Sequence, residues 1–163
     1  MFRKILLVLA IALVIIQFFH PDKNTDESTE AEANDISKVL NVPETVQNIL
    51  QTSCYDCHSN NTNYPWYAEL QPVAWWLNDH IVEGKGELNF NEFSTYSLRR
   101  QYHKLEEIIE QVKEGEMPLS SYTIIHKDAK LSTEQKASVH SWASASMDSM
   151  KAHYPADSLL RKK

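Results

Sequence analysis

The chain has 163 residues, which is enough for one domain of ordinary size. Hydrophobic residues make up 42% and charged residues 23% of it, and its three glycines and six prolines argue against a loop-dominated or all-β design. The formal net charge is −6 and the basic residues are scattered except at positions 161–163, so the sequence offers no basic surface for nucleic acid and we expect no such partner.

The first twenty residues have the pattern of an export signal. Arg3 and Lys4 precede an apolar run over residues 5–19 that only Gln17 interrupts. The far end of the run lacks the small-residue pair that a signal peptidase needs, which favours an uncleaved signal-anchor helix over residues 1–20. The run is shorter than the about 20 residues of a usual spanning helix, so cleavage stays open as an alternative. Arg3 and Lys4 predict a single-pass protein of the cell membrane, with a cytoplasmic N-terminus and a periplasmic or otherwise extracytoplasmic main domain.

An acidic, polar segment follows, and we predict a flexible linker over residues 21–38. Its carboxylates are Asp22, Asp26, Glu27, Glu30, Glu32 and Asp35. We place the folded domain at residues 39–155 and a basic C-terminal tail at residues 156–163.

Helical patterns dominate the folded part, with no sustained alternation of apolar and polar residues, so we predict an all-α class. The expected helices cover about residues 43–54, 73–82, 98–112 and 132–150. Gly84 and Gly115 are expected to end the second and third helices. Ser132 and Gln135 form a capping-box pattern at the start of the fourth.

The chemistry-bearing motif is the stretch Cys54, Tyr55, Asp56, Cys57, His58, a C-x-x-C-H pattern. Two thiols at this spacing can form thioethers with the two vinyl groups of one haem, while the histidine that follows presents its imidazole to the iron. We therefore predict one covalent haem c on Cys54 and Cys57, with His58 as the proximal iron ligand.

Three other uses of the same cysteines were considered. A thiol–disulfide pair is expected within a βαβ pattern, which the sequence lacks. A zinc site needs further nearby ligands, and the chain has no third cysteine. A structural disulfide is sterically poor across two residues. All three are weaker readings than haem attachment.

Aromatic residues follow the motif closely. Large rings supply apolar area around a porphyrin, and the polar edges of Tyr and Trp can hydrogen-bond its propionates. We predict haem packing for Tyr64, Trp66, Trp75 and Trp76.

Met117 is the expected distal iron ligand. It lies just past a predicted helix end, beside Pro118, which stiffens the loop. A thioether opposite a histidine is the ligand pair of cytochromes with raised potential. The histidines His80, His103 and His126 are the alternatives for this position.

With these residues in view, the chain resembles small single-haem c-type cytochromes, and more closely the membrane-anchored haem-binding domain family of bacterial envelopes. The resemblance covers about residues 42–142 and is carried by the segments CYDCHSN, YPWY, LNF and GEMPL, together with Pro72, Trp75, Trp76, His80, Glu83 and Gly84. It implies a cytochrome c-like helical domain around covalent haem, with His58 and Met117 on the iron.

The expected function is that of a one-electron carrier at the outer face of the cytoplasmic membrane, an electron-transfer protein rather than an enzyme. Its partners would be the membrane and redox proteins with basic docking patches. The alternative is a haem-based peroxidase, or a gas or redox sensor, with a displaceable sixth ligand.

Overall fold

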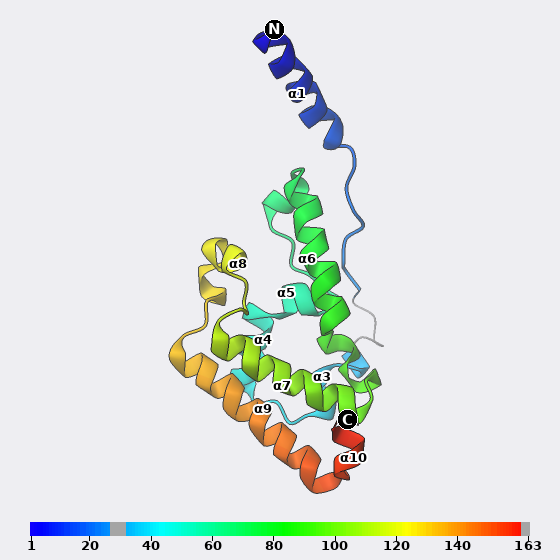
Figure 1. The fold of residues 1–163 in the computed structure, drawn as a ribbon, viewed down its shortest axis with the longest axis vertical. Helices are drawn as coiled ribbons and strands as arrows, with labels where there is room; N and C mark the ends of the chain where they lie inside the picture. The colour runs from blue at the N-terminus through cyan, green and yellow to red at the C-terminus, as the bar shows by residue number, and fades with distance from the viewer. Residues whose placement is uncertain (27–31, 161–163) are drawn as a thin grey trace.

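Helices make up most of the chain that the computed structural model describes, residues 1–26 and 32–160 (Figure 1). The longer helices are α1 (Phe2–Ile16), α4 (Glu44–Ser53), α6 (Val73–Glu87), α7 (Leu98–Glu114) and α9 (Thr133–His153). The short ones are α3 (Ile36–Val39), α5 (Tyr55–His58), α8 (Ser120–Ile125), α10 (Ala156–Leu159) and the 3-10 turns η1 (Trp66–Glu69), η2 (Phe90–Thr95) and η3 (Lys127–Ala129). The described residues form no strand beyond one isolated bridge between Thr25 and Asn61, so the all-α prediction is confirmed.

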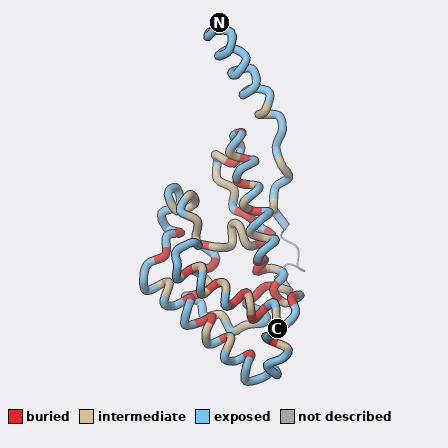
Figure 2. Tube along the Cα trace, viewed as in Figure 1, coloured by how far each residue is buried: buried red, intermediate tan, exposed pale blue. Residues whose placement is uncertain are grey.

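The main core lies between α4, α7 and α9, whose inner faces carry most of the buried positions (Figure 2). Helix α7 buries Leu105, Ile108 and Val112 at helical spacing, and α9 covers them with Val139 and Trp142. This pattern was predicted from the sequence, and the structure confirms both helices.

The ends of α7 and α9 follow local signals. Gly115 ends α7 in the left-handed conformation at φ 83°, which a side chain with a Cβ rarely adopts. The Ser132 side chain accepts a hydrogen bond from the Gln135 backbone N–H, and the Gln135 side chain accepts one from the Ser132 N–H. The predicted capping box is therefore confirmed.

Helix α6 extends further than the sequence pattern indicated. It continues through Gly84 to Glu87, so the expected stop at Gly84 was wrong. The glycine serves close packing instead: a Cβ at Gly84 would lie 2.8 Å from the carbonyl oxygen of Cys57. Helix α6 thus lies directly against the C-x-x-C-H segment.

Helix α1 has no buried residue and extends away from the other helices (Figure 1). Within residues 1–26 and 32–160, no helix combines the length and the apolar character needed to cross a bilayer.

The described parts of the expected linker pack against the domain. Asn24 accepts a hydrogen bond from the Thr62 backbone N–H, and the Asp26 N–H donates to the Asn60 carbonyl oxygen. Asp35 is buried and caps α3 by accepting from the Ser37 N–H. Here the structure differs from a solvated spacer, because local polar groups find backbone partners.

Two predicted segments lie partly outside the described residues. Glu27 and Glu30 of the expected linker fall there, as do positions 161–163 of the expected basic tail. The first part of that tail forms α10, which buries Leu159 against the main core.

Candidate functional site

The C-x-x-C-H motif forms one tight turn. Helix α4 ends at Ser53, α5 starts at Tyr55, and Cys54 lies between them as the cap of both. The backbone N–H groups of Cys57 and His58 both donate to the Cys54 carbonyl oxygen, at 3.2 and 3.0 Å. Residues three and four apart in a helical turn share a face, so both thiols and the imidazole emerge on the same side.

Two neighbouring cavities meet at this turn, with volumes of about 370 and 290 Å³. Volumes of this order are those of small-molecule and cofactor sites, roughly 300 Å³ and above. Both are lined by Ser53, Cys54, His58, Glu87, Met117 and Pro118. The larger cavity extends into the apolar core between α4, α7 and α9, and the smaller one extends towards α6 and α8.

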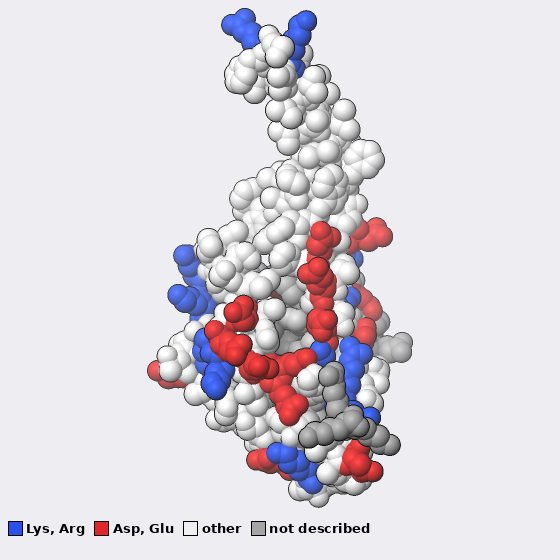
Figure 3. All heavy atoms as spheres, in the orientation of Figure 1, with Lys and Arg blue, Asp and Glu red and all other residues white. Residues whose placement is uncertain are grey.

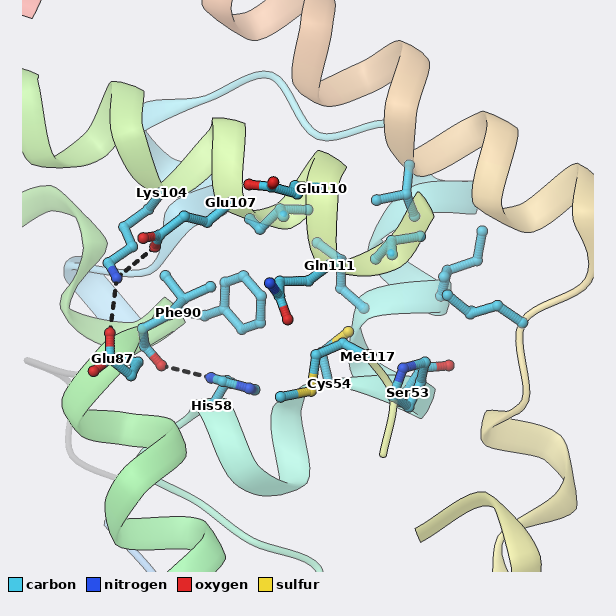
Figure 4. Close-up of a pocket in the computed structure, with 18 residues that line it drawn as sticks. Ser53, Cys54, His58, Glu87, Phe90, Lys104, Glu107, Glu110, Gln111 and Met117 are labelled. Atoms are coloured by element: carbon cyan, nitrogen blue, oxygen red, sulfur yellow. Dashed lines mark hydrogen bonds and ion pairs between the residues drawn. The ribbon is translucent and has the colours of Figure 1, made fainter. Parts of the chain in front are cut away.

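His58 is held in the form that binds metal. Its Nδ1 lies 2.9 Å from the Leu88 carbonyl oxygen, and because a carbonyl only accepts, Nδ1 must carry the proton (Figure 4). The lone pair is then on Nε2. Burial, as the largest influence, lowers the pKa of His58 from its ordinary value, so the ring is neutral at pH 7. A neutral imidazole with a fixed Nδ1 proton is a metal ligand with its outer hydrogen bond already made.

The two thiols are unbonded to each other and weakly acidic. Burial, followed by the charge of the neighbouring Cys57, raises the pKa of Cys54 to about 12. Burial, followed by the charge of Asp56, raises the pKa of Cys57 to about 11. Thiol oxidoreductases have the opposite property, a lowered pKa, so this environment argues against a redox dithiol.

The zinc alternative also finds no support in the described residues. They contain no group of three or more His, Cys, Asp or Glu side chains that could hold a metal ion. The C-x-x-C-H turn and the Met117 loop together present one imidazole, two thiols and one thioether to these cavities, which suits haem attachment better than a closed zinc site.

Met117 reaches the cavities on a loop that folds back over the end of α7. The N–H groups of Gly115, Glu116 and Met117 all donate to the carbonyl oxygen of Gln111. The Met117 side chain lines both cavities, as His58 does, and Figure 4 shows it beside Cys54. The structure thus brings together the four residues predicted for haem attachment and ligation.

The three histidine alternatives lie elsewhere or have other contacts. His80 lines the smaller cavity, but its Nδ1 lies 2.8 Å from the Trp76 carbonyl oxygen and its ring lies against the Trp76 ring. His103 pairs with Glu106 and Glu107. His126 hydrogen-bonds the Tyr67 hydroxyl, and neither it nor His103 lines the two cavities.

The predicted aromatic packing is not found at the cavities. None of Tyr64, Trp66, Trp75 and Trp76 lines either one. Helix α6 directs its smaller apolar residues inward and its two tryptophans outward, where they are exposed. The Tyr64 hydroxyl accepts a hydrogen bond from the Asn24 N–H instead. Phe90 is the aromatic ring that faces the larger cavity.

Two polar groups at the site were missed by sequence reasoning. The Tyr122 hydroxyl lines the smaller cavity and donates to Asp56 at 2.6 Å, from 66 positions along the chain. Lys104 lines the larger cavity with only 9% of its side chain exposed, and donates to Glu107 at 2.6 Å and Glu87 at 3.2 Å. The sequence did contain a signal for Lys104: it stands four residues before Ile108, on the apolar face of an amphipathic helix.

Burial lowers the pKa of Lys104, but the hydrogen bonds to Glu107 and Glu87 outweigh it and leave this pKa above its ordinary value. The ammonium group is therefore charged at neutral pH. Its positive charge also contributes to the lowered pKa of His58. The larger cavity thus contains a cation on the side of α7, paired with two carboxylates.

Comparison with known proteins bears on the same residues. The haem-binding domain family matches residues 11–145, a span that holds the C-x-x-C-H turn, both cavities and the Met117 loop. No curated protein and no solved structure matches the chain. Because the match extends over most of the sequence, the chain belongs to the haem-binding domain family.

Proposed function

We propose that this protein carries one covalent haem c and transfers single electrons. Cys54 and Cys57 would form the thioethers, and His58 and Met117 would be the protein ligands of the iron. The observation that carries the proposal is the hydrogen bond from His58 Nδ1 to the Leu88 carbonyl oxygen, on a ring whose Nε2 is left for the metal. Haem c, when bound, supplies an iron that alternates between ferric and ferrous states.

The chain's own residues would do the remaining work. The Leu88 carbonyl oxygen fixes the tautomer and orientation of His58. The apolar walls of the larger cavity keep water away from that ring, and they come from Leu50, Phe90, Ile108, Leu131 and Val139. The folded-back loop after α7, held by three backbone hydrogen bonds to the Gln111 carbonyl oxygen, places Met117 at the wall of both cavities. No separate substrate pocket is required for such a carrier.

The location of the protein forms part of the proposal. Residues 1–20 would direct export and hold the chain at the outer face of the cytoplasmic membrane, with Arg3 and Lys4 on the cytoplasmic side. Support comes from the apolar run of α1, which buries no residue, and from the basic residues Arg3 and Lys4 in its first turn. Attachment raises the effective concentration near membrane redox proteins, which would be the partners.

Replacing Met117 with Leu tests the ligand assignment. Leucine keeps the apolar volume but removes the sulfur, so the reduction potential should fall and the ferrous protein should bind carbon monoxide readily. Absorption spectra of both oxidation states and a potentiometric titration measure these changes, on protein made in a host that attaches haem c.

Met147→Leu is the matched control, because Met147 packs against the main core and lines neither cavity. It should leave the spectrum and the potential unchanged. A wild-type protein that is already five-coordinate and binds carbon monoxide would overturn the carrier proposal in favour of a peroxidase or a gas sensor. A spectrum unaffected by Met117→Leu would make His80 the next residue to replace.

A further inference from the structure

Large apolar side chains gather in the open at one end of the domain, which we call the apolar end. It consists of Trp66, Leu70, Trp75, Trp76, Ile124 and Ile125, from η1, the start of α6 and α8. Trp66 is 78% exposed and Ile124 is 67% exposed. Three of the four tryptophans belong to this set, while the fourth, Trp142, is buried in the core. Exposed apolar clusters of this kind mark interaction surfaces.

One hydrogen bond and one ring contact connect the parts of the apolar end. The hydroxyl of Tyr67, next to Trp66, lies 2.6 Å from His126 Nε2, next to Ile125. The rings of Trp66 and Tyr67 are 5.9 Å apart. The residue that follows α8 is thus hydrogen-bonded to η1, and η1 packs against α6.

The same end is joined to the foot of α1. Gln17, the residue after α1, accepts a hydrogen bond from the Gln71 N–H at 2.9 Å and donates to the Gln71 carbonyl oxygen at 3.2 Å. The Gln71 side chain in turn donates to the Phe19 carbonyl oxygen at 2.6 Å. Gln71 directly follows Leu70, so these hydrogen bonds hold the C-terminal end of α1 next to the apolar end.

Charge is distributed in agreement with this arrangement. In the view of Figure 3, α1 beyond its first turn and the adjoining end of the domain show almost no charged atoms, whereas acidic side chains gather further down over α6 and α7. Glu69, between Trp66 and Leu70, is paired with Lys23. This ion pair borders the apolar end, but none of the six residues that define the apolar end is charged.

We propose that the apolar end lies on the surface of the lipid bilayer into which α1 inserts. The inference rests on the membrane attachment proposed above. Tryptophan is enriched at the membrane–water interface, where its apolar ring and its N–H are both accommodated. Helix α1 has 15 residues and so a length of about 22 Å, which is shorter than the hydrocarbon core of about 30 Å. Because the helix is short, the residues that follow it should lie close to the lipid headgroups.

The bilayer fits this surface better than a second copy of the chain does. An inserted α1 leaves the domain beside Gln71, the residue after Leu70, so the headgroup region would already occupy the space in front of the apolar end. A protein partner seated there would have to share that space with lipid. Docking would hold the C-x-x-C-H turn in one orientation relative to the membrane. The acidic side chains over α6 and α7 would remain accessible to partners.

Photo-crosslinking of the full-length, haem-loaded protein in phospholipid nanodiscs tests the inference. The photoreactive residue p-benzoylphenylalanine is placed singly at Trp66, at Ile124, at Leu160 and at Ile11. Leu160 is the matched control, since it is also exposed but lies by α10 at the opposite end of the molecule. Ile11, in the middle of α1, reports insertion. Mass spectrometry after irradiation identifies lipid adducts.

We expect lipid adducts at Trp66, Ile124 and Ile11, with a yield several-fold above that at Leu160. Adducts at Ile11 without adducts at Trp66 and Ile124 would overturn the docking inference and leave the proposed membrane attachment intact. Crosslinked dimers through Trp66 or Ile124 would overturn it in favour of a second copy of the chain. Absence of lipid adducts at all four positions would overturn the membrane attachment, and the docking surface with it.

Discussion

At the scale of single residues, His58 combines three properties that a proximal ligand needs. It is mostly removed from water, it is neutral because burial lowers its pKa, and its Nδ1 proton is committed to the Leu88 carbonyl oxygen. The hydrogen bond could not be predicted from the motif, because Leu88 lies 30 positions further along the chain. The hydrogen bond is nevertheless what leaves the Nε2 atom free to bind the iron of the proposed haem.

The two thiols yield a prediction about pH. Burial raises the pKa of Cys57 to about 11 and that of Cys54 to about 12, and the thiolate is the reactive form. Iodoacetamide should therefore modify the folded, haem-free protein at pH 8 roughly a hundredfold more slowly than the chain in urea. The rate should rise about tenfold per pH unit towards pH 11. Mass spectrometry of timed samples measures both values.

The same shifts make the stability of the haem-free protein depend on pH. A thiol whose pKa is raised by folding stays protonated in the native state at a pH where the unfolded chain has already lost the proton. The stabilising contribution is complete below the unfolded thiol pKa of about 8.5 and is lost as pH rises through about 11. Equal alkylation rates in buffer and in urea would contradict the buried environment of the thiols.

At the scale of elements, the packing of α6 on the C-x-x-C-H turn depends on Gly84. A methyl group there would meet the Cys57 carbonyl oxygen at 2.8 Å, so Gly84→Ala must push α6 away from the turn. We expect the free energy of unfolding to fall by about 1–3 kcal/mol, the usual cost of overpacking. Urea denaturation monitored by circular dichroism measures the change.

Gly86 provides the matched control in the same helix. A Cβ at Gly86 has no neighbour within 4 Å, so Gly86→Ala should raise the free energy of unfolding by about 0.5–1 kcal/mol through helix propensity alone. If both substitutions changed stability in the same direction, the close contact between Gly84 and Cys57 would not be the reason for the glycine.

These elements also show what the sequence could and could not predict. Helices α4, α7 and α9 were predictable, because their apolar residues recur at helical spacing and their ends carry local signals such as Ser132 and Gly115. The stop predicted at Gly84 failed since a glycine that ends a helix and one that admits a neighbouring backbone look alike in sequence.

The site divides in the same way. Cys54, Cys57 and His58 could be predicted to lie together because one five-residue motif contains them, whereas Lys104 and Tyr122 reach the cavities only through the packing of other helices. The sequence also did not predict that Trp75 and Trp76 of α6 point outward. Aromatic content near a motif predicts burial in general, but the side of the helix on which each ring lies depends on the tertiary packing.

At the scale of the whole molecule, acidic side chains surround the entrance to the cavities. Glu83 and Glu87 of α6 and Glu107 and Glu110 of α7 line them, and Figure 3 shows the acidic side chains of the visible face following these two helices. The formal net charge of −6 has the same sign. Cationic partners should therefore be attracted to the face through which electrons would pass.

Small redox complexes of opposite charge test this field on the haem-loaded protein. Stopped-flow oxidation of the ferrous protein by the cationic tris(phenanthroline)cobalt(III) complex should slow as salt is added, and oxidation by anionic ferricyanide should accelerate, because ions screen the field over a distance of about 10 Å at 0.1 M. In low salt, Glu83→Gln combined with Glu110→Gln should slow the reaction with the cationic complex roughly two- to fivefold.

The control removes the same amount of charge elsewhere. Glu44 and Glu134 are exposed at the starts of α4 and α9 and line neither cavity, so the double change Glu44→Gln and Glu134→Gln leaves the entrance intact. If the position of the carboxylates matters, this variant should react with the cationic complex nearly as fast as the wild type. Equal slowing by both pairs would show that only net charge acts, and that the acidic side chains at the entrance have no special part in guiding a redox partner to the site.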